Sequence, residues 1–193
     1  MAKTAALGQW QNWPPFFSLS RSSLFRQAQG GEAYAFHRID MAHLHDKIDF
    51  TAAIFVVEAG RILLIHHRKL NHWLPLGGHI ELDEDPETAA LREAREESGL
   101  EVELLGERPP TTGPGTRALI APRFLDIHRI SDTHEHIGMI YWARPKSGEL
   151  QLAASEHHDI RWCSAADLDT LEPTISPAVK WYCLKALDEI TAH

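Results

Sequence analysis

Residues 78–100 read GHIELDEDPETAALREAREESGL, and the most informative side chains of this 193-residue chain lie in that stretch. Glu93, Glu96 and Glu97 are so spaced that in a helix their carboxylates project from neighbouring positions on one side. Like charges at such spacings destabilise a helix by about 0.2–0.5 kcal/mol per pair. We therefore expect a cation between them, and oxygen ligands of this kind favour Mg²⁺ or Mn²⁺ over zinc.

Residues suited to the two ends of this helix flank the glutamates. Asp85 suits the N-cap, and Pro86 suits the first helical position, where no amide hydrogen is needed. Gly99 suits the position at the end of a helix where the backbone adopts the left-handed conformation. Glu84 precedes the helix and can reach the same cation, while Arg92 can orient a carboxylate through a forked hydrogen bond. Small and apolar positions for packing on a sheet are Ala89, Ala90, Leu91 and Ala94.

The same stretch resembles the Nudix box, G-x5-E-x7-R-E-U-x-E-E-x-G-U, in which U is an apolar residue. Its fixed positions are filled by Gly78, Glu84, Arg92, Glu93, Glu96, Glu97 and Gly99, and its apolar positions by Ala94 and Leu100. The lead-in, residues 74–81, departs from the commoner Pro-Gly-Gly run because Leu76 is inserted. A solvated acidic helix is the alternative interpretation, and the number of matched positions argues against it. Strand patterns on both sides extend the resemblance over about residues 47–190.

Composition is that of one ordinary globular domain, with 44% hydrophobic and 24% charged residues. The net charge of −8 argues against bulk nucleic acid or an anionic membrane as the partner. We expect no membrane span and no signal peptide. The chain contains two cysteines, Cys163 and Cys183, which we interpret as small core residues of a cytoplasmic protein. An oligomer is compatible with the sequence.

The chain divides into an N-terminal arm over residues 1–46 and a domain over residues 47–193. Residues 1–31 show no period, and residues 32–46 predict a short helix. Strands are predicted over residues 50–57 and 61–67 as a hairpin, then 73–80, 101–105, 117–130 paired with 136–143, and 159–163. Further helices are predicted over residues 165–171 and 177–190. Periodicity leaves α/β and α+β open; the resemblance implies an α/β fold, an α-β-α sandwich with a central mixed sheet.

The resemblance also implies a reaction, the metal-assisted hydrolysis of a diphosphate linkage by a Nudix-type pyrophosphohydrolase. Glu93, Glu96 and Glu97 would hold Mg²⁺, with Glu84 as an added ligand, and Arg92 would orient them. The substrate class is a nucleoside diphosphate derivative or nucleoside triphosphate, from which a nucleoside monophosphate is released. Glu96 or Glu97 is the favoured proton acceptor, and Glu156, before the last strand, is the weaker candidate.

Five further residues are candidates for binding the substrate. Arg68 and Lys69 would neutralise phosphates, although a basic hairpin end is an equal alternative. Trp73 would stack on a base, although a core anchor is the more favoured interpretation. Gly77 and Gly78 would allow close approach of the backbone to metal or phosphate.

Three histidines raise the possibility of a structural metal: His134 and His136 have strand spacing, and His128 precedes them. Neither a Cys₂His₂ nor a His-Glu-x-x-His spacing is present, so a pocket rim or plain surface is favoured for these histidines.

Two other functions of the chain stay open. A nucleotide-sensing Nudix domain without activity would usually lack box glutamates, which this chain keeps. A diphosphate isomerase would need a catalytic cysteine, and Cys163 belongs to no matched motif.

Overall fold

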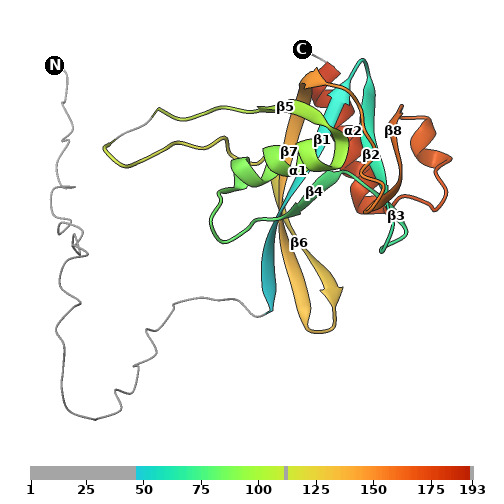
Figure 1. The fold of residues 1–193 in the computed structure, drawn as a ribbon, viewed down its shortest axis with the longest axis horizontal. Coiled ribbons are helices and arrows are strands. Elements are labelled where there is room, and N and C mark those ends of the chain that lie inside the picture. Colours follow the sequence, from blue (N-terminus) through green and yellow to red (C-terminus); the bar gives the residue numbers. More distant parts are fainter. Residues whose placement is uncertain (1–46, 111–112, 192–193) are drawn as a thin grey trace, which may run out of the picture. The chain divides into compact units, whose positions relative to one another are not determined.

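A computed structural model of the chain describes residues 47–110 and 113–191 (Figure 1). The helix predicted within residues 32–46 lies outside these ranges, and the boundary at residue 47 stays a prediction. The elements are, in order, β1 (Ile48–Glu58), β2 (Arg61–His67), β3 (His72–Leu74), β4 (Leu76–His79), α1 (Pro86–Ser98), β5 (Leu100–Leu105), β6 (Phe124–Ser131), β7 (His134–Gly148), β8 (His157–Cys163), the 3₁₀ turn η1 (Asp167–Asp169) and α2 (Pro177–Thr191).

The sheet is mixed and is organised around β1. This strand runs parallel to β7, whereas β2 and β4 pair with its other edge in antiparallel register. Strands β5 and β6 pair with β7, and β3 and β8 pair with β2. The predicted hairpin of β1 and β2 is confirmed, and it turns through Ala59 and Gly60, whose φ angles of +48° and +70° are those of a tight hairpin turn.

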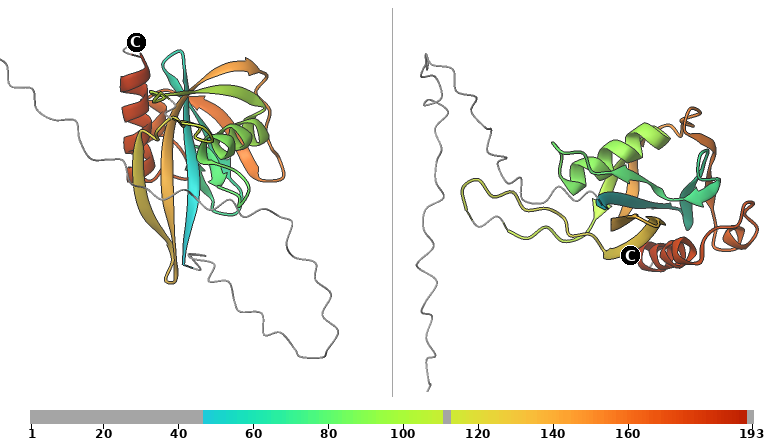
Figure 2. Two further views of the ribbon diagram at one scale, coloured as in Figure 1. Left: turned by 90° about the vertical axis from the view of Figure 1, so that its left-hand side faces the viewer. Right: turned by 90° about the horizontal axis from the view of Figure 1, so that it is seen from below.

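The two helices cover opposite faces of the sheet, so the predicted α-β-α sandwich is confirmed (Figure 2). Successive strand residues point to opposite faces. Phe55 and Val57 therefore pack with α2, whereas Ile54 and Val56 pack with α1. The α1 side of this second cluster consists of the alanines that the sequence had placed against a sheet, namely Ala89, Ala90 and Ala94. Their short side chains bring the acidic helix close to the sheet.

The predicted ends of α1 are confirmed. Asp85 is the N-cap, and its Oδ1 accepts hydrogen bonds from the backbone N–H groups of Glu87 and Thr88 at 3.0 and 3.2 Å. Gly99 ends the helix in the left-handed region with φ of +72°. These caps fix where the helix begins and ends, and so fix the directions in which its glutamates project.

Two predicted elements are shorter than expected. Strand β6 begins at Phe124 rather than at residue 117, because the preceding loop is bound to the start of α1 instead of to the sheet. There Arg108 pairs with Glu87 at 2.9 Å, and the N–H of Ile120 donates to the same carboxylate. The helix predicted over residues 165–171 is only the turn η1, which is closed by an i→i+3 hydrogen bond of 3.0 Å from the N–H of Thr170 to the carbonyl of Asp167.

Gly77 is a position at which any side chain should disturb the sheet. Its φ is +146°, and an added Cβ would lie 2.1 Å from the carbonyl oxygen of Ala52 in β1. We expect Gly77→Ala to lower the free energy of unfolding by about 2–4 kcal/mol or to prevent folding. The measurement is chemical unfolding followed by circular dichroism. Gly113→Ala is the control, because a Cβ there would meet no atom of the described residues within 4 Å other than its chain neighbours. Equal stability of both variants would contradict the assignment.

Candidate active site

Arg92 lies at the centre of the acidic helix face and bonds three carboxylates. Its Nη2 is 2.5 Å from Oε1 of Glu84, and its Nη1 is 2.8 Å from Oε1 of Glu93 and 3.0 Å from Oε2 of Glu96. Nη2 also donates to the carbonyl oxygen of His79 at 3.2 Å. One guanidinium therefore holds the loop glutamate and two helix glutamates together at the end of β4.

Glu97 is held separately, at the buried side of the same helix. Its side chain is 6% exposed, and its Oε2 accepts a 2.7 Å hydrogen bond from the N–H of Gly77. Nε2 of His157, a fully buried residue, lies 3.0 Å from Oε1 of Glu97. That distance is short enough for an ion pair, but neither ring nitrogen of His157 makes a well-aligned hydrogen bond to the described residues. The two groups face each other in a dry interior, where a charge interaction at this distance is only weakly screened.

Glu156 joins Glu97 and His157 from the start of β8. One ligand atom from each of these three residues lies within 4.8 Å of the other two. Arg68 fixes this segment: its backbone N–H donates to the carbonyl of Glu156 at 2.9 Å, and its Nη2 donates to the carbonyls of Ala154 and His157 at 3.0 and 3.2 Å. Arg68, which follows β2, thereby holds the segment whose exposed residue Glu156 lies beside Glu97 of the box.

The electrostatic environment divides the box glutamates into two groups. Hydrogen bonding to Arg92 lowers the pKa of Glu84 below its ordinary value. Burial raises the pKa of Glu93, and it also raises the pKa of Glu97, even though His157 and the N–H of Gly77 oppose that shift. Glu93 and Glu97 are thus carboxylates whose negative charge the protein alone does not fully compensate.

This arrangement suits a hard divalent cation. Arg92 bonds one oxygen of Glu93 and one of Glu96, and the second oxygen of each makes no hydrogen bond within the described part of the chain. Glu84 differs, since both of its oxygens accept hydrogen bonds, from Arg92 and from the N–H of Glu81. Carboxylate oxygens are the donors that Mg²⁺ and Mn²⁺ prefer. The residues present therefore match the cation that the acidic helix predicts.

The two glycines before the helix make close approaches of different kinds. A Cβ on Gly78 would lie 2.3 Å from Oε1 of Glu93, so its absence leaves room for that carboxylate. Gly77 instead approaches the backbone of β1, as described above, and gives its N–H to Glu97. Both glycines shape the carboxylate cluster itself.

Trp73 lies apart from the cluster. Trp73 is 1% exposed in the α2-side core, its Nε1 donates to the carbonyl of Glu172, and its ring stacks on His66 at 5.2 Å between centroids. These contacts leave no open ring face for a base, which corrects its place among the candidate substrate-binding residues. Lys69 is exposed at the end of β2.

His157 is the site residue that the sequence analysis missed. Its position beside Glu156 was the only signal, because nothing local shows that a residue of β8 faces a helix of residues 86–98. Glu87 was missed as well: it is 6% exposed and anchors the loop before β6 to the first turn of α1. Both are buried polar residues whose partners lie far away in the sequence.

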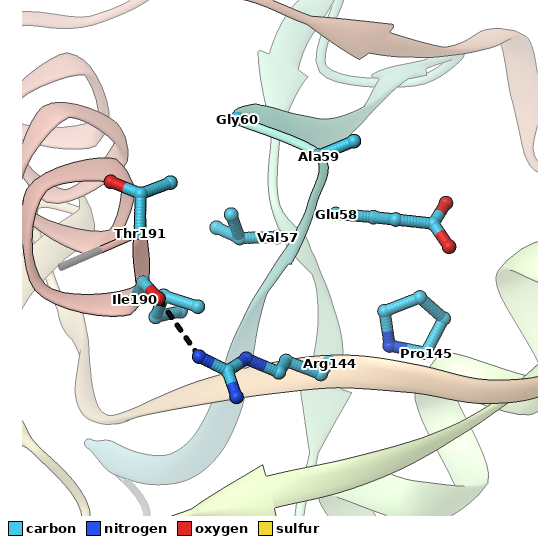
Figure 3. A pocket seen from close by; sticks show the side chains of 8 residues that line it. All are labelled: Val57, Glu58, Ala59, Gly60, Arg144, Pro145, Ile190 and Thr191. Atoms are coloured by element: carbon cyan, nitrogen blue, oxygen red, sulfur yellow. Dashed lines mark hydrogen bonds between the residues drawn. The ribbon is translucent and has the colours of Figure 1, made fainter. Parts of the chain in front are cut away.

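A depression in the surface lies away from the carboxylate cluster. Figure 3 shows it between the turn of β1 and β2, strand β7 and the last turn of α2, where Nη2 of Arg144 donates a 2.8 Å hydrogen bond to the carbonyl of Ile190. This contact satisfies a carbonyl at the C-terminal end of the helix. The depression shares no residue with the box.

Comparison with known proteins gives the family. The NUDIX domain model matches residues 48–183, which is more than half of the chain. The chain belongs to the Nudix family. A MutT-like protein of Streptomyces ambofaciens is 45% identical over 142 residues, which cover 74% of this chain and 78% of that protein. The homology indicates pyrophosphohydrolase activity, as the sequence resemblance implied.

Two further relatives support this assignment. The bis(5'-nucleosyl)-tetraphosphatase (asymmetrical) of Rattus norvegicus is 26% identical over 149 residues, covering 73% of this chain and 88% of that enzyme. The crystal structure of a NUDIX-family hydrolase from Clostridium perfringens has a TM-score of 0.64 and 34% identity, with 74% of this chain and 97% of that chain covered. Among the residues described for this chain, no helix is long and apolar enough to cross a membrane.

The Nudix box predicts an unusual dependence of stability on pH in the absence of metal. The pKa of Glu97 is raised in the folded state, so its ionised form destabilises the fold above the unfolded pKa of about 4.3. Glu97→Gln removes this charge and keeps an oxygen for the N–H of Gly77. In EDTA we expect the variant to melt at a higher temperature than the wild type at pH 7, with the difference vanishing towards pH 4. A variant that melts lower at pH 7 would contradict this electrostatic assignment.

Proposed function

We propose that the protein is a Mg²⁺-dependent hydrolase that cleaves a diphosphate linkage in a nucleoside diphosphate derivative or nucleoside triphosphate and releases a nucleoside monophosphate. The observation that carries the proposal is the convergence of the box glutamates with Glu156. Glu84, Glu93 and Glu96 meet at Arg92, and Glu97 meets Glu156 beside His157. A set of carboxylates this dense suits divalent cations and a polyphosphate better than an uncharged ligand.

In this proposal Glu93, Glu96 and Glu97 hold Mg²⁺, or Mn²⁺ in its place. The bound cation would neutralise the diphosphate and lower the pKa of a water molecule that attacks phosphorus. Arg92 keeps Glu93 and Glu96 in place, and Glu84, with both oxygens engaged, orients Arg92. Such fixed positions contribute to the rate because phosphoryl transfer depends mainly on positioning and charge neutralisation.

The attacking water also needs a proton acceptor. We assign this role to a glutamate of the box, Glu96 or Glu97, and keep Glu156 as the alternative. Burial favours Glu97, since its raised pKa brings a carboxylate closer to the working range of a general base at neutral pH. Glu156 is exposed and lies within reach of the same cluster.

The family and the charges near the box support the proposed substrate class. Nudix hydrolases act on small nucleotide-derived substrates, and the rat relative is named for its action on a dinucleoside tetraphosphate. Arg68 and Lys69, at the end of β2, stay candidates for neutralising phosphates, although the guanidinium of Arg68 already bonds two carbonyls. We place the activity in the cytoplasm because the two cysteines are free.

The rival functions are less well supported. A sensing domain without activity would be expected to have lost box glutamates, and this chain retains them. An isomerase would need a reactive cysteine, but Cys163 is fully buried in the α2-side core and burial raises its pKa to about 11.

A substrate panel tests the proposed function. The purified protein is incubated with nucleoside triphosphates, dinucleoside polyphosphates and nucleoside diphosphate sugars, with Mg²⁺ or with EDTA, and products are separated by chromatography. We expect Mg²⁺-dependent release of a nucleoside monophosphate from at least one class, because the carboxylates require a cation. Binding of these compounds without any hydrolysis would favour the sensing function instead.

Substitution of Glu97 tests the residue assignment. We expect Glu97→Gln to lower kcat by a factor of about 10² or more while the chain stays folded, because it removes a cation ligand and a candidate base. Glu156→Gln should lower kcat less. The control is Glu101→Gln, which removes an equal charge from an exposed residue that pairs with Arg95 at 3.3 Å. A larger loss in Glu156→Gln than in Glu97→Gln would move the proton acceptor to Glu156.

A further inference from the structure

Strand β1 begins, and the β6–β7 hairpin turns, at one end of the sheet (Figure 1). Four histidines and two aspartates of the described residues lie at this end. Asp49 is in register with His136 across β1 and β7, and His136 is in register with His128 across β7 and β6. His79 is in register with Thr51, two residues after Asp49. Register partners share a face of the sheet. This histidine cluster comprises Asp49, His79, Asp126, His128, His134 and His136.

The cluster lies on the face opposite to the Nudix box. Asp49 and Thr51 point to the same face of the sheet as Phe55, because side chains alternate along β1. Phe55 packs against Tyr182 of α2 at 5.6 Å between ring centroids. His79 follows Gly78, the residue that faces Glu93, so its side chain points to the other side of the sheet. The thickness of the sheet therefore separates the cluster from the glutamates of α1.

Several possible ligand atoms of the cluster lie close together. Oδ2 of Asp49 is 3.6 Å from Nε2 of His79 and 3.1 Å from Nε2 of His134. One ligand atom from each of Asp49, His79 and His136 lies within 4.8 Å of the other two. Four donors at about 2.05 Å from a tetrahedral zinc ion are separated from each other by about 3.3 Å. The separations of 3.1 and 3.6 Å from Asp49 are close to this value, and the side chain of His136 would move closer to complete the set.

The histidine rings of the cluster also lie close together. The ring centroid of His136 lies 4.8 Å from that of His79, 5.1 Å from that of His134 and 5.5 Å from that of His128. Neutral imidazoles each keep a lone pair, which is the form that binds a metal.

The outer part of the cluster is held to α2 through Asp126. Nδ1 of His128 is 3.1 Å from Oδ1 of Asp126, and Oδ2 of Asp126 accepts a 2.9 Å hydrogen bond from the hydroxyl of Tyr182. Gly138 makes room for this carboxylate, because a Cβ there would lie 2.8 Å from Oδ1 of Asp126. These contacts hold the ring of His128 beside that of His136 at the edge of the cluster.

We propose that Asp49, His79 and His136, with His134 as the fourth donor, bind a divalent transition-metal ion, with zinc as the test ion, at a site separate from the Nudix box. Imidazole nitrogens suit zinc and related ions, whereas Mg²⁺ prefers oxygen donors. The two sites are therefore expected to select different cations. An ion in the cluster would link β1, β4 and β7, and so it would stabilise the folded chain by mass action.

Metal titration of the full-length, metal-stripped protein tests the proposal. Zn²⁺ is titrated by calorimetry with Mg²⁺ in excess, and Co²⁺ is followed by its visible absorption, which reports the ligand geometry. We expect about one Zn²⁺ per chain, displacement of Co²⁺ by Zn²⁺, and affinity at least about tenfold weaker in His136→Ala and in His79→Ala. Asp49→Asn gives the same test if His136→Ala does not fold.

Two controls separate this site from the box and from nonspecific binding. His158→Ala removes an exposed histidine that contacts His66 rather than the cluster, and it should bind Zn²⁺ like the wild type. Glu97→Gln alters the box and should also leave the zinc affinity unchanged. The proposal is overturned if the wild type takes up no Zn²⁺ in excess Mg²⁺. It is equally overturned if uptake is lost in Glu97→Gln but retained in His136→Ala and His79→Ala.

Discussion

Repulsion among carboxylates is the constraint on which the rest of the site depends. Glu84, Glu93 and Glu96 share the single guanidinium of Arg92, so that one positive charge faces three negative ones. Glu97 is buried nearby with the N–H of Gly77 and the ring of His157 as its contacts. This partial neutralisation holds the oxygens in place and leaves charge for a cation to balance.

The fold supplies the rigidity that such a cluster requires. The caps at Asp85 and Gly99 fix the helix, the alanines of α1 bring it close to the sheet, and Gly77 and Gly78 leave space beside it. The loop before β8 is tied to β2 through Arg68, which fixes Glu156 and His157 opposite the helix. Charges that would separate in a flexible chain are therefore held together by packing and hydrogen bonds.

Features that depend on local sequence could be predicted, whereas contacts across the sheet could not. The helix ends, the first hairpin and the box spacing each follow from residues only a few positions apart. The pairing of His157 with Glu97 depends on the register of β8 on β2, and that of His79 with Asp49 on the register of β4 on β1. Trp73 shows the same limit, because its burial depends on η1 and α2, about a hundred residues later.

Calorimetric titration of the metal-free protein with Mg²⁺ and Mn²⁺ tests the central claim most directly, since it asks whether the carboxylates hold a cation at all. The account predicts that the wild type binds both ions and that its melting temperature rises when they are added, while Glu93→Gln binds them much more weakly. A wild type that takes up neither ion, and melts at the same temperature with and without them, would contradict the account.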